Sequence, residues 1–194
     1  MPPIFLPSPQ TPDVRTIEIT PRHEPTLRRF FEANPEYFLA AHGEPAKPSE
    51  AYEEIYGGPP QDWGFSRKWL IGYVDTHNNL VAFANVISDF LAPGVWHIGL
   101  FMIETSRHGS GDAQLLYRGL ESWAYKHGAQ WMRLGIVQGN ARAERFWETL
   151  GYRQTRIREG VEMGKRMNTI RVMFKPITGG TLEQYLSRVE RDRP

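Results

Sequence analysis

The segment Arg107-His108-Gly109-Ser110-Gly111-Asp112-Ala113 is the part of the chain best suited to bind a charged ligand. It stands between an apolar run typical of a strand and a long amphipathic run typical of a helix. Small residues at a helix N-terminus let backbone N–H groups converge on a phosphate, and the helix dipole favours its negative charge. The segment therefore predicts a binding site for a phosphorylated cofactor.

Two common phosphate-binding loops fit this segment poorly. A Walker-type nucleotide loop has Lys and Ser or Thr directly after its last glycine, whereas Asp112 and Ala113 follow Gly111. A dinucleotide fingerprint has a third spaced glycine and an acidic residue at the end of the next strand, whereas Val137 and Gln138 end the strand expected here. The identity of the ligand therefore depends on the motifs around the two glycines.

The hydrophobic pattern predicts an α/β domain with a mixed sheet. Strands are expected at 14–20, 67–75, 80–89, 95–104, 130–137, 152–158 and 166–175. Helices are expected at 24–42 with a break at Pro35, and at 49–56, 113–126, 140–150 and 182–189. The strand, helix and strand of residues 95–137 should pair in parallel or splay apart, with the glycine segment at the switch between them.

The composition is that of one soluble globular chain of 194 residues. Five prolines between Pro2 and Pro12 predict a flexible tail at 1–12, followed by a single domain at 13–178 and a helical extension at 179–194. The absence of cysteine excludes disulfides, thiolate metal sites and a cysteine nucleophile. No apolar run is long enough to span a membrane and no signal peptide is recognisable, so a cytoplasmic protein is expected.

Charge is distributed unevenly along the chain, although the net charge is only +1. Residues 1–66 contain 10 acidic and 5 basic side chains, whereas residues 67–194 contain 12 and 18. The small net charge argues against a nucleic-acid partner or a membrane surface, and the basic part contains the expected phosphate site. Ordinary compositional scatter is the alternative explanation.

Two motifs resemble those of the GNAT superfamily of acetyl-CoA-dependent N-acetyltransferases. The family's central motif is Gln/Arg-x-x-Gly-x-Gly/Ala, and residues 108–113 match it except that His108 takes its first position. The next motif is Asn-x-x-Ala-x-x-Phe-Tyr-Glu-x-Leu-Gly-Phe/Tyr, which residues 140–152 match except at Trp147. The resemblance implies a GNAT-like fold with a central, mixed but mostly antiparallel twisted sheet of about six to seven strands. This sheet would be splayed at the cofactor site and flanked by helices.

The resemblance further implies that acetyl-CoA (coenzyme A) is the co-substrate and that no metal is needed. The residues expected to contact it are Phe101, Met102, Ile103, His108, Gly109, Ser110, Gly111, Asp112, Ala113, Asn140, Ala143, Phe146 and Trp147. The strand at 101–103 would pair with the pantetheine arm, and one of its N–H groups would stabilise the oxyanion. Asn140 is also the expected N-cap of its helix.

An amine acceptor must lose a proton before it attacks, so a base or a water chain is needed. His97 and Glu104, at the two ends of one expected strand, are the candidate catalytic residues. The alternative to a catalytic role is that His97 is a hydrogen-bonded histidine within its strand and that Glu104 is a solvated carboxylate at the strand end. Trp147 stands where many family members have a tyrosine that protonates the leaving thiolate. An indole is not an acid, so that proton is expected from water or another group.

The resemblance implies that the N-terminal helices and the loop between the last two strands, about 159–165, surround the acceptor. Glu53, Glu54 and Tyr56 lie in the acidic part of the chain, which favours a cationic small-molecule amine over the alternative of a protein amine. Arg153, Arg156 and Arg158 are expected on a solvated strand face, with contact to the CoA 3′-phosphate or to an acidic substrate as the alternative. Family members are often dimers, which leaves a homodimer open.

The sequence thus predicts an N-acetyltransferase in which a primary amine attacks acetyl-CoA directly within a ternary complex. Two alternatives stay open. One is a non-catalytic acyl-CoA-binding or regulatory module of the same fold, favoured by the missing tyrosine. The other is a transferase of a different acyl group.

Overall fold

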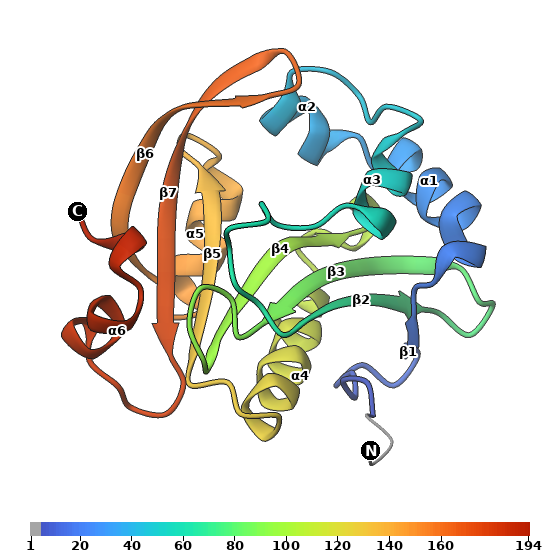
Figure 1. The fold of residues 1–194 in the computed structure, drawn as a ribbon. Coiled ribbons are helices and arrows are strands. Elements are labelled where there is room, and N and C mark those ends of the chain that lie inside the picture. The colour runs from blue at the N-terminus through green and yellow to red at the C-terminus, as the bar shows by residue number, and fades with distance from the viewer. Residues whose placement is uncertain (1–4) are drawn as a thin grey trace.

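The computed structural model describes residues 5–194 and contains one seven-stranded sheet with helices on both sides (Figure 1). The strands are β1 (Arg15–Glu18), β2 (Arg67–Val74), β3 (Leu80–Ser88), β4 (Val95–Ile103), β5 (Trp131–Val137), β6 (Arg153–Met163) and β7 (Arg166–Pro176). The α-helices are α1 (Glu24–Ala33), α2 (Glu36–His42), α3 (Glu50–Tyr56), α4 (Asp112–Lys126), α5 (Ala141–Thr149) and α6 (Leu182–Arg188). Short 3-10 turns form η1 (Pro21–His23), η2 (Thr105–Arg107) and η3 (Glu190–Asp192). These elements confirm the predicted fold class.

The strand order is β1-β2-β3-β4-β5-β7-β6, and every neighbouring pair is antiparallel except β4 and β5. These two strands pair in parallel only from Val95 opposite Trp131 to Ile98 opposite Leu134. Beyond those residues the two strands run on without pairing with each other. The predicted splay is therefore confirmed, and it leaves a gap in the middle of the sheet.

A β-bulge marks the point where β4 leaves β5. Val86 of β3 pairs with Ile98 and Asn85 pairs with Leu100, so Gly99 is an extra residue on β4. A bulge bends its strand and increases the local twist. The gap therefore begins at a residue whose lack of a side chain suits the bend.

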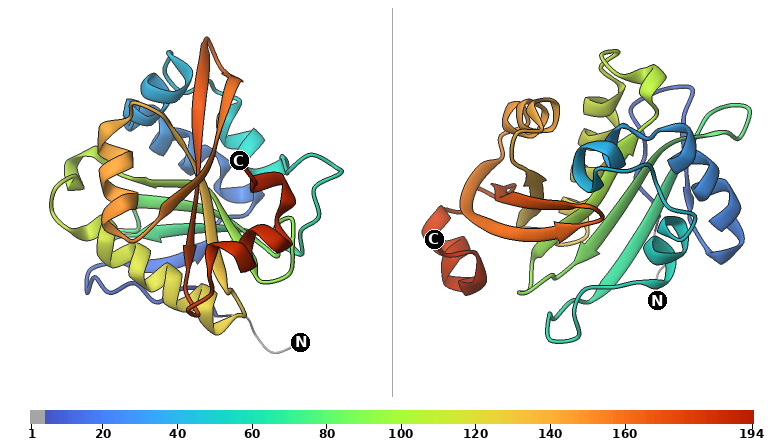
Figure 2. Two further views of the ribbon diagram at one scale, coloured as in Figure 1. Left: turned by 90° about the vertical axis from the view of Figure 1, so that its left-hand side faces the viewer. Right: turned by 90° about the horizontal axis from the view of Figure 1, so that it is seen from above.

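Side chains alternate between the two faces of the sheet, and different helices cover each face (Figure 2). We call the face under α4 and α5 face A. Face B is covered by α1 and α3 over β1–β4 and by α6 and η3 over β5–β7. Helix α2 lies over the end of the sheet where β4 and β5 diverge (Figure 2). Within residues 5–194, no helix is both long and apolar enough to cross a membrane.

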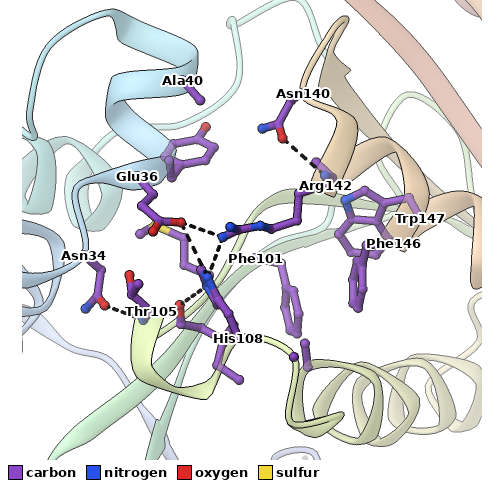
Figure 3. A pocket seen from close by; sticks show the side chains of 16 residues that line it. Asn34, Glu36, Ala40, Phe101, Thr105, His108, Asn140, Arg142, Phe146 and Trp147 are labelled. Carbon is purple, nitrogen blue, oxygen red and sulfur yellow. Dashed lines mark hydrogen bonds and ion pairs between the residues drawn. The ribbon is translucent and has the colours of Figure 1, made fainter.

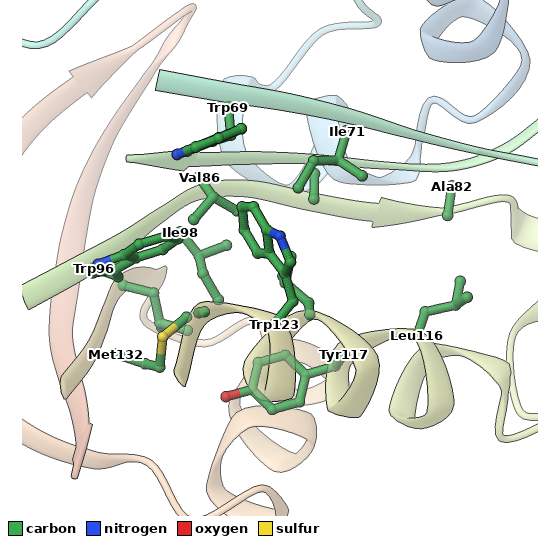
Figure 4. Close-up of a cluster of buried hydrophobic side chains, with 14 of the residues drawn as sticks. Trp69, Ile71, Ala82, Val86, Trp96, Ile98, Leu116, Tyr117, Trp123 and Met132 are labelled. Carbon is green, nitrogen blue, oxygen red and sulfur yellow. The ribbon is translucent and has the colours of Figure 1, made fainter. Parts of the chain in front are cut away.

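The largest hydrophobic cluster fills face A beneath α4 (Figure 4). Trp123 of α4 packs edge-on against Trp69 and Trp96, with ring centroids 5.1 and 5.3 Å apart. Such aromatic pairs contribute about 0.5–1.5 kcal/mol each beyond the apolar area that they bury. This packing fixes α4, and with it the glycine segment at its N-terminus.

Residues 5–12 lie along the outside of α4. The indole N–H of Trp123 donates to the Phe5 carbonyl oxygen at 2.6 Å. A Cβ at Gly119 would come within 2.6 Å of the Ser8 carbonyl oxygen, so the close approach requires glycine. The expected tail at 1–12 includes residues 1–4, which lie outside the described residues. Its flexibility and the domain bounds at 13–178 and 179–194 stay predictions.

The hairpin of β6 and β7 is longer than the sequence suggested. A loop was expected at about 159–165, but β6 continues to Met163 and only Gly164 and Lys165 form the turn. Gly160 lies inside β6, where it occupies a bulge at a φ of +67°. The hairpin tip reaches α2, where the Lys165 N–H donates to the His42 carbonyl oxygen at 2.8 Å.

Candidate active site

A cavity of about 450 Å³ lies where β4 and β5 diverge, between α2 on one side and α4 and α5 on the other (Figure 3). Its lining residues are Asn34, Glu36, Tyr37, Ala40, Phe101, Met102, Ile103, Thr105, His108, Gly109, Ala113, Asn140, Arg142, Ala143, Phe146 and Trp147. The elements that form it come from three separate parts of the sequence. The cavity has an apolar floor and a polar rim, which suits an elongated ligand with charged groups at one end.

The glycine segment forms an open cradle at the rim. Gly109 and Gly111 have φ values of +80° and +92°, and no heavy atom lies within 4 Å of a Cβ built on either. Within residues 5–194, the N–H groups of Gly109, Gly111 and Ala113 donate to no backbone carbonyl. Three free donors at the N-terminus of a fifteen-residue helix fit an anionic group such as a pyrophosphate.

Asp112 would oppose an anion in this cradle if its charge were unpaired. Its carboxylate accepts from Arg107 Nη1 at 3.0 Å, and Arg107 also contacts Asp13 at 3.3 Å. The Ser110 hydroxyl donates to the Arg107 carbonyl oxygen at 2.8 Å and so fixes the loop. The negative charge of Asp112 is therefore directed to Arg107 rather than to the cradle.

Aromatic side chains form the floor of the cavity. The rings of Phe101 and Phe146 stack with centroids 6.2 Å apart, and both contact Trp147 edge-on (Figure 3). Trp147 is almost buried and packs against Tyr117 and Tyr152. Trp147 thus separates the two tyrosine hydroxyls behind it from the cavity.

Asn140 performs its predicted capping role. Its side-chain oxygen accepts from the Ala143 N–H at 3.2 Å and begins α5 (Figure 3). The small Ala143 side chain leaves room beside it on the cavity wall. The cap therefore orients the helix face that carries Phe146 and Trp147.

A polar bridge crosses the mouth of the cavity from α2 to α5 (Figure 3). Arg142 Nη1 lies 2.5 Å from both Glu36 Oε2 and His108 Nδ1. The other ring nitrogen of His108 lies 3.3 Å from the Ile103 carbonyl oxygen. A bound anionic ligand would compete with Glu36 for the guanidinium of Arg142.

Most of the predicted contact residues do meet around this cavity. Ser110, Gly111 and Asp112 are exceptions, since they belong to the cradle but do not line the cavity. Both predicted catalytic residues lie outside it. The Glu104 carboxylate turns toward Ser106 and Arg107. Catalysis by Glu104 therefore stays a prediction without support from this geometry.

His97 lies on face B, next to the start of the gap. Its Nδ1 accepts from Arg133 Nη1 at 3.2 Å, and its ring stacks on Phe90 at 4.6 Å. Burial and the charge of Arg133 lower the pKa of His97 well below its ordinary value. A neutral histidine held in this way is a weak base, and its catalytic role also stays a prediction.

Glu54 of α3 is a carboxylate that the structure brings close to the gap. Its Oε2 accepts from Asn85 Nδ2 at 2.8 Å, and the Asn85 side chain lies 3.5 Å from a Cβ built on Gly99. Burial raises the pKa of Glu54 above its ordinary value. Glu53 and Tyr56, by contrast, are exposed, so only Glu54 of the three acceptor-wall residues faces the sheet.

Lys68 fixes the helix that carries Glu54. Its ammonium group donates to the carbonyl oxygens of Glu54 at 2.8 Å and Ile55 at 3.0 Å, and also to that of Gly57. Sequence reasoning missed Glu36, Tyr37, Asn85 and Arg142 as residues of the site. Arg142 stands inside the second motif, which was the one available signal, while the others are brought in only by the packing of α2 and α3.

Comparison with known proteins agrees with this geometry. The family model described as the acetyltransferase (GNAT) family matches residues 20–152. No curated protein matches the sequence significantly.

Among solved structures, spermidine N-acetyltransferase from Vibrio cholerae, in complex with CoA and spermine, is similar at a TM-score of 0.65 and 14% identity. The match covers 86% of this chain and 96% of that one. An acetyltransferase from Thermus thermophilus is similar at a TM-score of 0.64 and 17% identity, and the match covers 85% of this chain and 97% of that one. A GCN5-related N-acetyltransferase from Kribbella flavida is similar at a TM-score of 0.62 and 19% identity, and the match covers 85% of this chain and 98% of that one. These likenesses show the shared fold.

Proposed function

Because the chain belongs to the acetyltransferase (GNAT) family, we propose that it transfers the acetyl group of acetyl-CoA to a primary amine by direct attack in a ternary complex. The observation that carries this proposal is the gap between β4 and β5, with a cradle of free N–H groups at one end and a part-buried carboxylate at the other. In the proposed reaction the amine nitrogen bonds to the acetyl carbon, the carbon–sulfur bond breaks, and coenzyme A leaves as a thiol once it gains a proton.

The residues present fit acetyl-CoA, which supplies an activated thioester carbonyl when bound. The N–H groups of Gly109, Gly111 and Ala113 would hold its pyrophosphate. The side of β4 that β5 leaves unpaired, from Gly99 to Ile103, offers backbone groups to an extended pantetheine arm, as an added strand would use them. Backbone N–H groups aimed at the thioester oxygen would stabilise the developing negative charge.

Glu54 is the residue that we propose as the general base. A carboxyl group with a raised pKa can accept a proton from an ammonium group near neutral pH more readily than an ordinary one. Asn85 Oδ1 is buried and has no donor within residues 5–194, so it is free to accept from the amine. The two groups lie beside Gly99, where the amine would meet the thioester. Burial of a negative charge here favours a cationic acceptor.

A non-catalytic acyl-CoA-binding module is the second candidate, and Trp147 favours it. This residue lines the cavity where many family members have a tyrosine, and its indole cannot protonate a thiolate. Transfer of a longer acyl group, a protein acceptor, a homodimer and a cytoplasmic location stay predictions.

Two variants test the proposal. Glu54→Gln should lower kcat by about a hundredfold, in the range expected for loss of a general base, while the dissociation constant for acetyl-CoA stays unchanged. The matched control is Glu53→Gln, on an exposed neighbour in the same helix. Gly111→Glu should abolish acetyl-CoA binding in calorimetry, because its side chain and charge would fill the cradle.

The readout is acetyl-CoA consumption with a panel of primary amines. Turnover by the wild type that falls in Glu54→Gln but not in Glu53→Gln supports the proposal. Tight acetyl-CoA binding without turnover of any amine would favour the non-catalytic module. No binding to the wild type would refute both.

A further inference from the structure

A cluster of arginines on face B is unrelated to the cradle described above. Arg156, Arg158 and Arg191 line an open cavity of about 610 Å³ together with Ile157, Glu159 and Val161. The guanidinium groups of Arg158 and Arg191 lie over the ring of Trp63, at 5.7 and 4.2 Å from its centroid. Two of these three arginines, which we call the basic cluster, are therefore held in place against an aromatic ring.

The negative charges nearby do not balance the basic cluster, because Glu159, which lines the same cavity, opposes only one of its three positive charges. Asp192 is the buried carboxylate next to it, but Arg133 occupies this group with hydrogen bonds of 2.7 and 2.8 Å. Arg158 reaches the same carboxylate only at 3.5 Å. Burial, and next the charge of Arg133, lower the pKa of Arg158. The basic cluster thus carries more positive charge than its own surroundings neutralise.

One hydrogen-bond donor in the cluster has no partner. Arg156 Nη1 donates to the Arg191 carbonyl oxygen at 2.7 Å, whereas Arg156 Nε is buried and has no acceptor within residues 5–194. Buried donors without partners are rare in folded proteins, and a charged one is especially unfavourable. An anion in this cavity would balance the excess charge beside the unpartnered donor.

A chain of contacts connects the basic cluster to the gap in the sheet. Arg158 shares Asp192 with Arg133, and Arg133 contacts His97, which lies two residues before Gly99. Since paired strands are about 4.8 Å apart, the basic cluster on β6, three strands from β4, lies roughly 15 Å from the bulge where the pairing of β4 and β5 ends. A small molecule can span this distance.

The floor between the two places has no side chain at Gly99 or Gly135, and β7 contributes Val172 and Ile170 between Gly135 and the basic cluster. Gly99 on β4 and Gly135 on β5 are both exposed, and Gly135 stands two residues after Arg133, so it faces the same side. Glu54 and Asn85 border this floor on one side, and the basic cluster borders it on the other. Face B therefore offers negative charge at the gap and positive charge farther away.

We propose that the acceptor amine also carries an anionic group, a carboxylate or a phosphonate-like group, which Arg156, Arg158 and Arg191 bind while the amine lies at Gly99. This inference rests on the proposed function, and it names the substrate class of the same site. The amine would approach Glu54 and Asn85, and the anion would lie against the basic cluster. An acceptor with a positive charge at one end and a negative charge at the other would bind in a single orientation.

The experiment compares amines that differ only in the anionic group. Each ω-amino carboxylate or ω-aminoalkyl phosphonate is paired with the alkylamine of the same chain length, over a series of lengths. The anionic partner should have a kcat/KM roughly tenfold higher or more at the best length, as hydrogen bonds to charged groups allow. Arg158→Gln should raise its KM by about the same factor, without changing the KM of the alkylamine or the binding of acetyl-CoA.

Two further variants serve as checks. Arg191→Gln alters an exposed member of the cluster and should act in the same direction if Arg158→Gln folds poorly. Arg153→Gln is the matched control, because Arg153 is exposed on β6 and lies over Phe174 rather than in the cavity. Equal use of the paired amines, with no effect of either cluster variant, would overturn the inference and leave the proposed function standing.

A calorimetric titration with an aminoalkyl phosphonate separates the two proposals. Binding to the wild type that is lost in Arg158→Gln, without turnover of any amine, would refute the acetyltransferase and still support the anion site. Absence of binding together with absence of turnover would overturn both.

Discussion

The substitution Asp192→Asn should strongly destabilise the protein, because Asp192 neutralises a buried arginine. The Asp192 side chain is 0% exposed and that of Arg133 is 5% exposed. Two hydrogen bonds of 2.7 and 2.8 Å join them, and the Tyr185 hydroxyl donates to the same carboxylate at 2.5 Å. An amide in this place keeps the shape but loses the charge, and its NH₂ group would face donors.

The expected loss follows from that geometry. Removing one partner of a buried ion pair costs about 3–5 kcal/mol in the free energy of unfolding, out of a total of about 5–15 kcal/mol. For a domain of this size each kcal/mol lowers Tm by about 2–4 °C, so Tm should fall by about 6–20 °C. Urea unfolding followed by tryptophan fluorescence measures the change.

A neighbouring ion pair provides the control. Glu190 contacts Arg193 at 3.2 Å, but their side chains are 76% and 50% exposed. Glu190→Gln should therefore change the free energy of unfolding by less than about 1 kcal/mol. A double-mutant cycle with Arg133→Met should show that the two losses are not additive, because each variant removes the same pair. Equal effects of Asp192→Asn and Glu190→Gln would refute the reasoning.

Three further predictions concern pH, cofactor affinity and the N-terminal segment. Burial alone would raise the pKa of Asp192, but the hydrogen bonds and charge of Arg133 outweigh it and hold that pKa below its ordinary value. Asp192 therefore stabilises the fold fully at pH values above its pKa in the unfolded chain. This stabilisation is lost as the pH falls through its lower pKa in the folded protein. The difference in urea midpoint between the wild type and Asp192→Asn should therefore shrink in acid. Glu36→Gln should raise the affinity for acetyl-CoA by up to about fivefold in calorimetry. The substitution removes an exposed ion pair, worth at most about 1 kcal/mol, in which Glu36 competes with the ligand for Arg142. A weaker affinity would show that Glu36 helps to bind the ligand. Gly119→Ala should lower Tm and speed proteolysis of residues 5–12, because its Cβ would meet the Ser8 carbonyl oxygen. This loss should outweigh a gain of about 1 kcal/mol in helix propensity. A higher Tm would mean that the contact is weak.

Local patterns were sufficient to predict most of the fold. The spacing of apolar residues along the sequence located the strands and helices. Asn140 was identified correctly as the N-cap of α5. The glycine segment was recognisable because its conformation depends on residues close together in the sequence. The loop expected at about 159–165 was wrong, because the bulge through which β6 continues to Met163 depends on pairing with β7 and has no local signal.

The parts of the site that escaped prediction depend on distant residues. Glu36 and Arg142 are far apart in the sequence and meet only because α2 lies over the end of the sheet. Asn85 becomes important only because a bulge on the neighbouring strand brings Gly99 beside it. Arg153, Arg156 and Arg158 were expected on a solvated face, with contact to an anion as the alternative. Arg153 is exposed, whereas nothing local indicated that Trp63 would contact Arg158 or that η3 would contact Arg156. Contacts of this kind follow from packing and have no signature in any one segment.

The divergence of β4 and β5 also bears on the order of events in turnover. Since the opening passes through the sheet, a ligand lying along β4 from the cradle leaves the exposed glycines of face B uncovered. Each substrate then has its own entrance, and neither obstructs the other. We expect random addition, in which a dead-end analogue of either substrate inhibits competitively against that substrate and non-competitively against the other. In the proposed reaction the acetylated product would leave from face B without first displacing coenzyme A.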